Sequence, residues 1–181
     1  YYHLFFPMAN EPAIRLADKV LELAPEHMSK VFFCNSGSEA NDTQVKIVWY
    51  YNNIRGKPEK KKIISRKQGY HGVTAVAASM TGLPRNHNSF NLPLDGFLHV
   101  SSPHHYWGAN TDETEVDFSK RLAVELDTLI QHEGPNTVAA FIAEPVMGAG
   151  GVITPPEGYF IEIQKVLKKH DVLFIADEVI C

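Results

Sequence analysis

The sequence predicts an α/β protein with a mostly parallel sheet and helices on both faces. Short apolar runs alternate with longer amphipathic stretches along most of the 181 residues. The apolar runs lack the polar–apolar alternation of a strand with one face in water, so both faces of the sheet are expected to be covered. Strands that alternate with helices are typical of a parallel sheet.

Composition restricts the class of protein. Hydrophobic residues make up 44% and charged residues 21% of the chain, as in soluble globular domains. A net charge of −4 argues against a nucleic-acid partner, and no run of about 18 apolar residues suggests a membrane span. Cys34 and Cys181 form neither a CxxC pair nor a zinc-binding pattern, which fits a reducing, cytoplasmic setting.

The first elements are a helix, a strand and a second helix. Asn10 can cap a helix that Pro25 ends. Its apolar residues recur at helical spacing: Ile14, Ala17, Val20, Leu21 and Ala24. The apolar run Val31–Cys34 predicts a short buried strand, and an amphipathic helix is expected from about Ser38 to Arg55.

The rest of the chain continues this alternation. Further strands are expected over residues 62–65, 98–100, 137–143 and 172–176. Helices are expected over residues 73–80, from about 117 to 132, and from Pro155–Pro156 to His170. Glycine-containing loops are expected at residues 68–72 and 148–151.

Polar residues follow three of the predicted strands. These residues are Asn35-Ser36-Gly37, Glu144 and Asp177. Ligands of parallel α/β sheets bind beyond the carboxyl ends of the strands. We therefore expect an active site at that edge of the sheet.

The turn Ser36-Gly37-Ser38 is expected to bind an anion. A helix presents free N–H groups and the positive end of its dipole at its start. Gly37 allows close approach to the backbone, and the hydroxyls of Ser36 and Ser38 can donate hydrogen bonds. The alternative is an ordinary capped helix with Ser38 as its N-cap and no ligand.

Nucleotide motifs do not fit this turn. The P-loop pattern requires a lysine that Gly37-Ser38-Glu39 does not offer, and Ile153 stands where a GxGxxG motif from Gly148 needs its third glycine. Pyridoxal phosphate (PLP) fits better, because a buried carboxylate such as Asp177 can keep its ring nitrogen protonated. Tyr70 can stack on the ring.

Four motifs carry a resemblance to a known family. They are Asn35-Ser36-Gly37-Ser38-Glu39-Ala40, Tyr70-His71-Gly72, Glu144-Pro145-Val146 and Asp177-Glu178-Val179. In this order the chain resembles class III aminotransferases of the omega-amino-acid and gamma-aminobutyrate type, which are fold-type I PLP enzymes. The resemblance implies that residues 1–181 form part of the large, cofactor-binding domain, without the N-terminal part and the C-terminal small domain.

The resemblance also implies roles for individual residues. Gly37 and Ser38 hold the phosphate, Tyr70 stacks on the ring with His71 beside it, and Asp177 pairs with the ring nitrogen. Val179 presses on the opposite ring face, and Glu144 lies near the cofactor oxygen and the substrate. The catalytic candidates are Asp177, Tyr70 and Glu144, and the cofactor-binding candidates are Ser36, Gly37, Ser38, Tyr70, His71, Glu144, Asp177 and Val179.

Each residue also has a plainer interpretation. Tyr70 could be a half-buried loop aromatic, His71 could bond a nearby backbone group, and Asp177 and Glu144 could be solvated ends of strands. The adjacent His104 and His105 rarely suffice for a metal ion without further ligands, so no metal site is predicted.

The implied activity is transfer of an amino group from an omega-amino acid or amine to a keto acid such as pyruvate. The family works as a homodimer with a shared active site. Its Schiff-base lysine is not among these 181 residues, so this chain alone is expected to be inactive. A PLP-dependent aminomutase or decarboxylase of the same fold, or a non-catalytic PLP-fold binding module, stay open as alternatives.

Overall fold

The computed structural model describes residues 9–181, so the first eight residues of the expected domain lie outside the described part. Contacts between residues divide the chain into two compact units, Tyr1–Cys34 and Asn35–Cys181.

Among residues 9–34 of the first unit there is one helix, α1 (Glu11–Leu23), where the sequence predicts it. The side chain of Asn10 caps this helix by accepting a hydrogen bond from the backbone N–H of Ala13 at 2.9 Å. The predicted strand Val31–Cys34 is wrong, because the segment adopts no regular structure. A strand needs a neighbour for its backbone hydrogen bonds, and no described residue bonds to this backbone. Phe32 is consequently 70% exposed.

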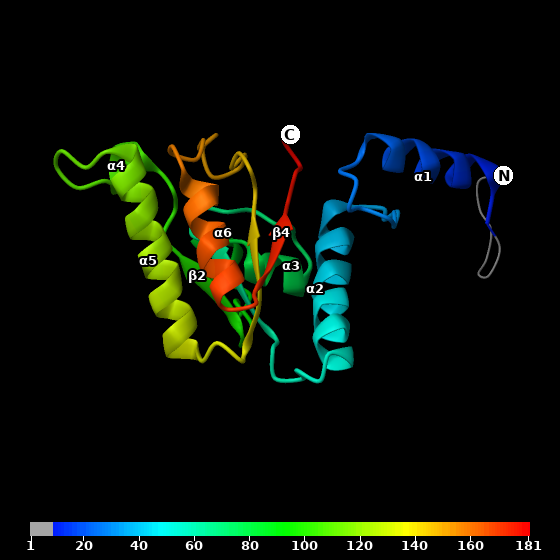
Figure 1. Ribbon diagram of the computed structural model, residues 1–181, viewed down its shortest axis with the longest axis horizontal. Helices are drawn as coiled ribbons and strands as arrows, with labels where there is room; N and C mark the ends of the chain where they lie inside the picture. The colour runs from blue at the N-terminus through cyan, green and yellow to red at the C-terminus, as the bar shows by residue number, and fades with distance from the viewer. Residues whose placement is uncertain (1–8) are drawn as a thin grey trace. The chain divides into compact units, whose positions relative to one another are not determined.

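The second unit is built on a parallel sheet of four strands in the order β2-β1-β3-β4 (Figure 1). The strands are β1 (Lys62–Arg66), β2 (Phe97–Val100), β3 (Val138–Ala143) and β4 (Leu173–Ala176). Arg66 pairs with Val100, and Ala143 pairs with Ala176. The last residues of the strands therefore lie along one edge of the sheet.

Helices cover both faces of this sheet, which confirms the predicted fold class. The helices α5 (Glu115–Glu133) and α6 (Tyr159–Lys169) share one apolar core with Ile64 and Phe141. The helices α2 (Gly37–Ile54) and α3 (Ala75–Met80) share the other with Ile63 and Ile142. The sequence did not predict the two short helices, η1 (Pro84–Asn86) and α4 (His105–Gly108).

Four helices begin at residues other than those predicted: α3 begins two residues later and α5 two residues earlier than expected, and α2 and α6 differ for identifiable reasons. The N-cap of α2 is Ser36 rather than Ser38, because the Ser36 hydroxyl accepts from the N–H of Glu39 at 3.2 Å. The Glu39 carboxylate in turn accepts from the N–H of Asn35 at 2.9 Å, much as in a capping box. Helix α6 begins at Tyr159 instead of Pro155, since Gly158 before it is left-handed, with φ 78°.

Candidate active site

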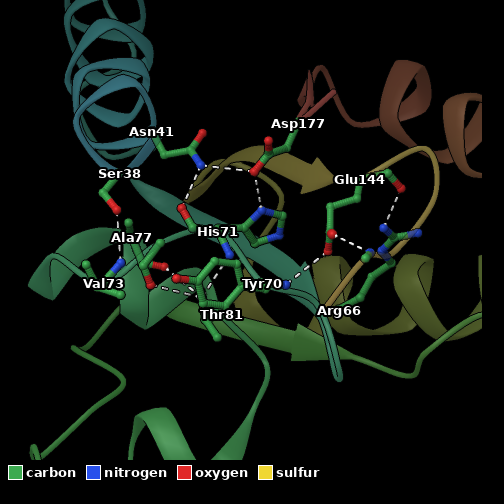
Figure 2. Close-up of polar contacts among 12 residues, drawn as sticks. Ser38, Asn41, Arg66, Tyr70, His71, Val73, Ala77, Thr81, Glu144 and Asp177 are labelled. Atoms are coloured by element: carbon green, nitrogen blue, oxygen red, sulfur yellow. Dashed lines mark hydrogen bonds and ion pairs between the residues drawn. The ribbon is translucent and has the colours of Figure 1, made fainter. Parts of the chain in front are cut away.

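Polar side chains gather at the carboxyl edge of the sheet (Figure 2). Glu144 directly follows β3 and Asp177 directly follows β4, as the sequence predicts. The N–H of Asp177 donates to the carbonyl of Ala143 at 2.9 Å, which continues the pairing of these strands past their last residues. The loop after β1 brings Tyr70 and His71 to the same edge.

Asp177 accepts two side-chain hydrogen bonds through one oxygen. Its Oδ2 lies 2.8 Å from Nδ1 of His71 and 3.0 Å from Nδ2 of Asn41. Burial raises the pKa of the Asp177 carboxyl, but the hydrogen bonds from His71 and Asn41 outweigh burial and hold the pKa below its usual value. Asp177 is therefore a carboxylate at neutral pH.

The contact with Asp177 sets the hydrogen-bonding role of the His71 Nδ1 atom. Because Nδ1 faces a carboxylate oxygen, Nδ1 carries a hydrogen and donates it. The side chain is fully buried, and Nε2 has no hydrogen-bond partner among residues 9–181. The backbone N–H of His71 donates to Oγ1 of Thr81 at 2.9 Å, which holds the loop against the end of α3.

The start of α2 presents backbone N–H groups that have no partner among residues 9–181. The first N–H groups of a helix have no partner inside it, and a Cβ placed on Gly37 would meet no atom within 4 Å. The hydroxyl of Ser38 accepts from the N–H of Val73 at 3.0 Å, which leaves its hydrogen free to donate. The hydroxyl of Ser36 is occupied as an acceptor by the cap.

Gly72 allows the loop to pack against α2. Its φ of +136° is unfavourable for other residues, and a Cβ there would lie 2.5 Å from Oγ of Ser38 and 2.8 Å from Cβ of Ala77. The absence of a side chain thus lets Val73 reach the Ser38 hydroxyl.

Glu144 connects two loops through its carboxylate. Oε1 accepts from the N–H of Tyr70 at 3.0 Å, and Oε2 accepts from the N–H of Gly148 at 2.9 Å. The residue is 1% exposed, so these backbone donors satisfy carboxyl oxygens that solvent does not reach. Tyr70 itself is half-buried, with its backbone fixed by this contact.

Val179 lies two residues beyond Asp177 and is 69% exposed. The structure thus brings His71 into direct contact with Asp177, and joins Tyr70 to Glu144 through the backbone. It does not give Val179 a buried position.

Sequence reasoning missed two residues of this site, Asn41 and Arg66. Asn41 begins a buried stripe of α2 at helical spacing, which continues through Val45 and Val48, and a polar residue on such a stripe is a usable signal. Arg66 ends β1, is fully buried, and donates from Nη2 to the carbonyl of Glu144 at 2.6 Å. Arg66 could have been found as Glu144 was, because ligands of parallel sheets bind beyond the carboxyl ends of the strands.

No cluster of three or more metal-binding side chains occurs within the described residues. In the same part of the chain, no helix combines the length and apolar character that crossing a bilayer requires.

Comparisons with known proteins agree on one family. The family model described as aminotransferase class-III matches residues 2–181. The chain is 58% identical to an uncharacterized aminotransferase of Sinorhizobium fredii, covering 99% of this chain and 38% of that protein. It is 57% identical to gamma aminobutyrate transaminase 1, mitochondrial, of Solanum lycopersicum, covering 100% of this chain and 35% of the relative.

Solved structures give the same result. The omega transaminase from Pseudomonas jessenii in complex with PMP is 63% identical, with a TM-score of 0.96 over 99% of this chain and 40% of that one. A structure described as a transaminase with L-ala is 58% identical, with a TM-score of 0.96 over 100% of this chain and 43% of that one. The chain thus spans well under half the length of these relatives.

Proposed function

The chain belongs to the class-III aminotransferase family, and on that premise we propose that the protein containing it is a PLP-dependent transaminase. Its donor is an omega-amino acid or amine, and its acceptor is a keto acid such as pyruvate. One observation carries the proposal: Nδ2 of Asn41, a residue in the second turn of α2, donates a hydrogen bond to Oδ2 of Asp177 at 3.0 Å. This bond brings the carboxylate and the anion-binding end of that helix to one edge of one sheet.

The described residues fit PLP at both ends. Backbone donors at the start of α2 suit a phosphate, and the space beside Gly37 is open. Asp177 binds its neighbours through Oδ2, so its other oxygen can accept from a protonated ring nitrogen. When bound, PLP supplies an electron-accepting ring that stabilises negative charge on the substrate carbon.

We assign the phosphate to the first turn of α2. The N–H groups of Gly37 and Ser38 point out of the helix end, and the Ser38 hydroxyl can donate its hydrogen. Ser36 contributes by capping the helix, which fixes the direction of these donors.

We assign the ring to the space beside Asp177. Asp177 keeps the ring nitrogen protonated, and His71 holds Asp177 in its ionised form. Tyr70 stacks on one ring face, and Val179, which is exposed here, presses on the other.

We further assign Glu144 to the active-site edge, where its carboxylate positions Tyr70 through the backbone N–H. The lysine that forms the Schiff base lies outside these 181 residues in this proposal, so the chain alone does not catalyse transamination. The chain spans 38% of the Sinorhizobium fredii relative and 35% of the Solanum lycopersicum relative. Proteins of that length have room for the lysine. Residues 1–181 are then part of the large domain.

We also propose that the complete protein is a homodimer with a shared active site. A hollow of about 610 Å³ opens next to Val73, whose N–H holds Ser38. Phe90, which lines this hollow, is 66% exposed, as expected of an apolar surface that a second copy covers. Size-exclusion chromatography with light scattering on the complete protein tests this state, and a monomer contradicts it.

A cytoplasmic location is also proposed. Cys34 and Cys181 are both free thiols, which suits a reducing compartment. Microscopy of the complete protein with a fluorescent tag tests this location.

The deciding experiment uses the complete protein with a panel of amines and keto acids. We expect PLP-dependent amino transfer, and its loss in Asp177→Ala. The matched control is Glu178→Gln, a neighbouring exposed acid. Carbon dioxide or a rearranged amino acid as the product would instead indicate the decarboxylase or the aminomutase. PLP binding without any turnover would indicate a binding module.

A further inference from the structure

One amide joins the two halves of the proposed cofactor site. Nδ2 of Asn41 donates to Oδ2 of Asp177 at 3.0 Å and to the backbone carbonyl of His71 at 2.7 Å (Figure 2). Asn41 is 6% exposed, so solvent does not compete for these hydrogen bonds. Both hydrogens of its amide group therefore have partners.

The orientation of this amide follows from its partners. A backbone carbonyl and a carboxylate are both acceptors, so the amide must present its NH₂ group to them. Reversing it would place the Asn41 oxygen against two other oxygens. The contact with Asp177 is a hydrogen bond to a charged group, which is stronger than one between neutral groups.

The position of Asn41 gives this contact its significance. The residue lies in α2, one turn after the free N–H groups of Gly37 and Ser38. Farther along the same helix, Val45 and Val48 pack into the apolar core, which anchors the helix on the sheet. Asn41 is thus held on a rigid element that also carries the anion-binding turn.

We propose that Asn41 is a positioning residue that holds the Asp177 carboxylate and the Tyr70–Gly72 loop at a fixed distance from the first turn of α2. The proposal rests on the function proposed above. One side chain then fixes the distance between the Asp177 carboxylate, which accepts from the ring nitrogen, and the N–H groups that donate to the phosphate. This distance is fixed before the cofactor binds. Asn41 does not touch the reacting atoms.

The test uses Asn41→Ala and Asn41→Asp in the complete protein. The matched control is Asn52→Ala, because Asn52 is a buried asparagine of the same helix whose Nδ2 donates to the Val48 carbonyl within that helix. The measurements are the dissociation constant for PLP and the pH at which the absorbance of the bound cofactor changes. In the cofactor-free protein, the NMR signal of the His71 Nδ1 proton is followed, assigned by its loss in His71→Asn.

We expect Asn41→Ala to weaken PLP binding by about tenfold or more, as for one lost hydrogen bond to a charged group. Asn41→Asp should weaken it further, because a second carboxylate then faces Asp177. Both variants should shift the His71 proton signal in the absence of PLP and the pH midpoint in its presence. The control should change none of the three readouts.

Failure of this inference is distinguishable from failure of the proposed function. If the unsubstituted protein neither binds PLP nor transfers amino groups, the proposed function is wrong. If it does both, the proposed function stands. The role of Asn41 is then wrong if Asn41→Ala changes the dissociation constant for PLP by less than about twofold and shifts neither the pH midpoint nor the His71 proton signal. Should both variants fail to fold, a crystal structure of the unsubstituted holoenzyme decides, and an Asn41 amide out of hydrogen-bonding distance of Asp177 overturns the inference.

Discussion

Nδ1 of His71 lies 2.8 Å from Oδ2 of Asp177 across 106 residues of sequence. The imidazole is fully buried and its backbone is fixed by Thr81, so the donor cannot turn away without breaking packed structure. Burial alone would raise the pKa of the Asp177 carboxyl. The hydrogen bond from His71 helps to explain why this pKa instead lies below its usual value.

Replacing His71 with Leu should remove this effect. In the native chain the folded pKa of Asp177 is depressed, so its contribution to stability is present above the unfolded pKa of about 3.9 and is lost as the pH falls through the folded pKa. Without the donor, the folded pKa rises. We expect the free energy of unfolding at neutral pH to fall by about 1–3 kcal/mol, and its decline below about pH 4 to become shallower.

Urea unfolding over the acid range measures both effects. His71→Asn serves as the matched variant, because the asparagine amide can place a donor near the position of Nδ1 and should restore part of the stability. Identical pH profiles for the leucine variant and the native protein would show that His71 does not control Asp177.

Gly72→Ala should disturb the Ser38 end of the site. The new Cβ would lie 2.5 Å from Oγ of Ser38, and the backbone there has φ +136°. We expect a loss of stability of about 1–3 kcal/mol from backbone strain, with weaker PLP binding in the complete protein because Ser38 or Val73 must move. Gly56→Ala is the control, since Gly56 has φ +72° but open space around it. Thermal unfolding and PLP titration measure the two effects. If Gly72→Ala and Gly56→Ala change both measurements equally, a specific clash at Ser38 is excluded.

Most of the fold was predictable from local patterns. The strand that became β3 is buried at every residue, and its apolar run is visible in the sequence. The apolar run Val31–Cys34 looked equally strand-like but forms no strand, because an apolar run indicates a strand only where another strand can pair with it. The start of α6 was misplaced because the two prolines resemble a helix start, whereas Gly158 determines it.

The site was predictable only in part, since sequence position shows which residues reach an edge but not which atoms meet. Glu144 and Asp177 follow strands, so their edge could be inferred. That Glu144 binds two backbone N–H groups, and that Asn41 binds Asp177, depends on how loops and α2 pack. Those contacts join residues far apart in the chain and leave no periodic signal.

Glu144→Gln should uncouple the loops that Glu144 joins. A glutamine keeps one oxygen as an acceptor but turns its NH₂ group toward the other backbone donor, at either Tyr70 or Gly148. One buried N–H then loses its partner, which costs about 1–3 kcal/mol. Denaturant unfolding measures the loss. Glu157→Gln is a suitable control, because that residue is exposed and its hydrogen bonds within the described part of the chain are made by its backbone alone. A Glu144→Gln protein as stable as the native one would contradict this role.

Lys60→Met should destabilise the edge of the sheet opposite the candidate site. Nζ of Lys60 lies within hydrogen-bonding distance of four backbone carbonyls, which share its three hydrogens: 3.2 Å from Pro135, 2.9 Å from Val138, 3.1 Å from His170 and 2.9 Å from Asp171. Methionine fills a similar volume but offers no donor, so buried carbonyls lose their partners, and we expect a loss of about 3 kcal/mol. Thermal unfolding with Lys61→Met, an exposed neighbour, as the control measures this loss. PLP affinity should stay unchanged, because these carbonyls precede β3 and β4 or lie at the start of β3, and the candidate site follows the carboxyl ends of these strands. A Lys60→Met variant as stable as the native protein would contradict this role of the ammonium group.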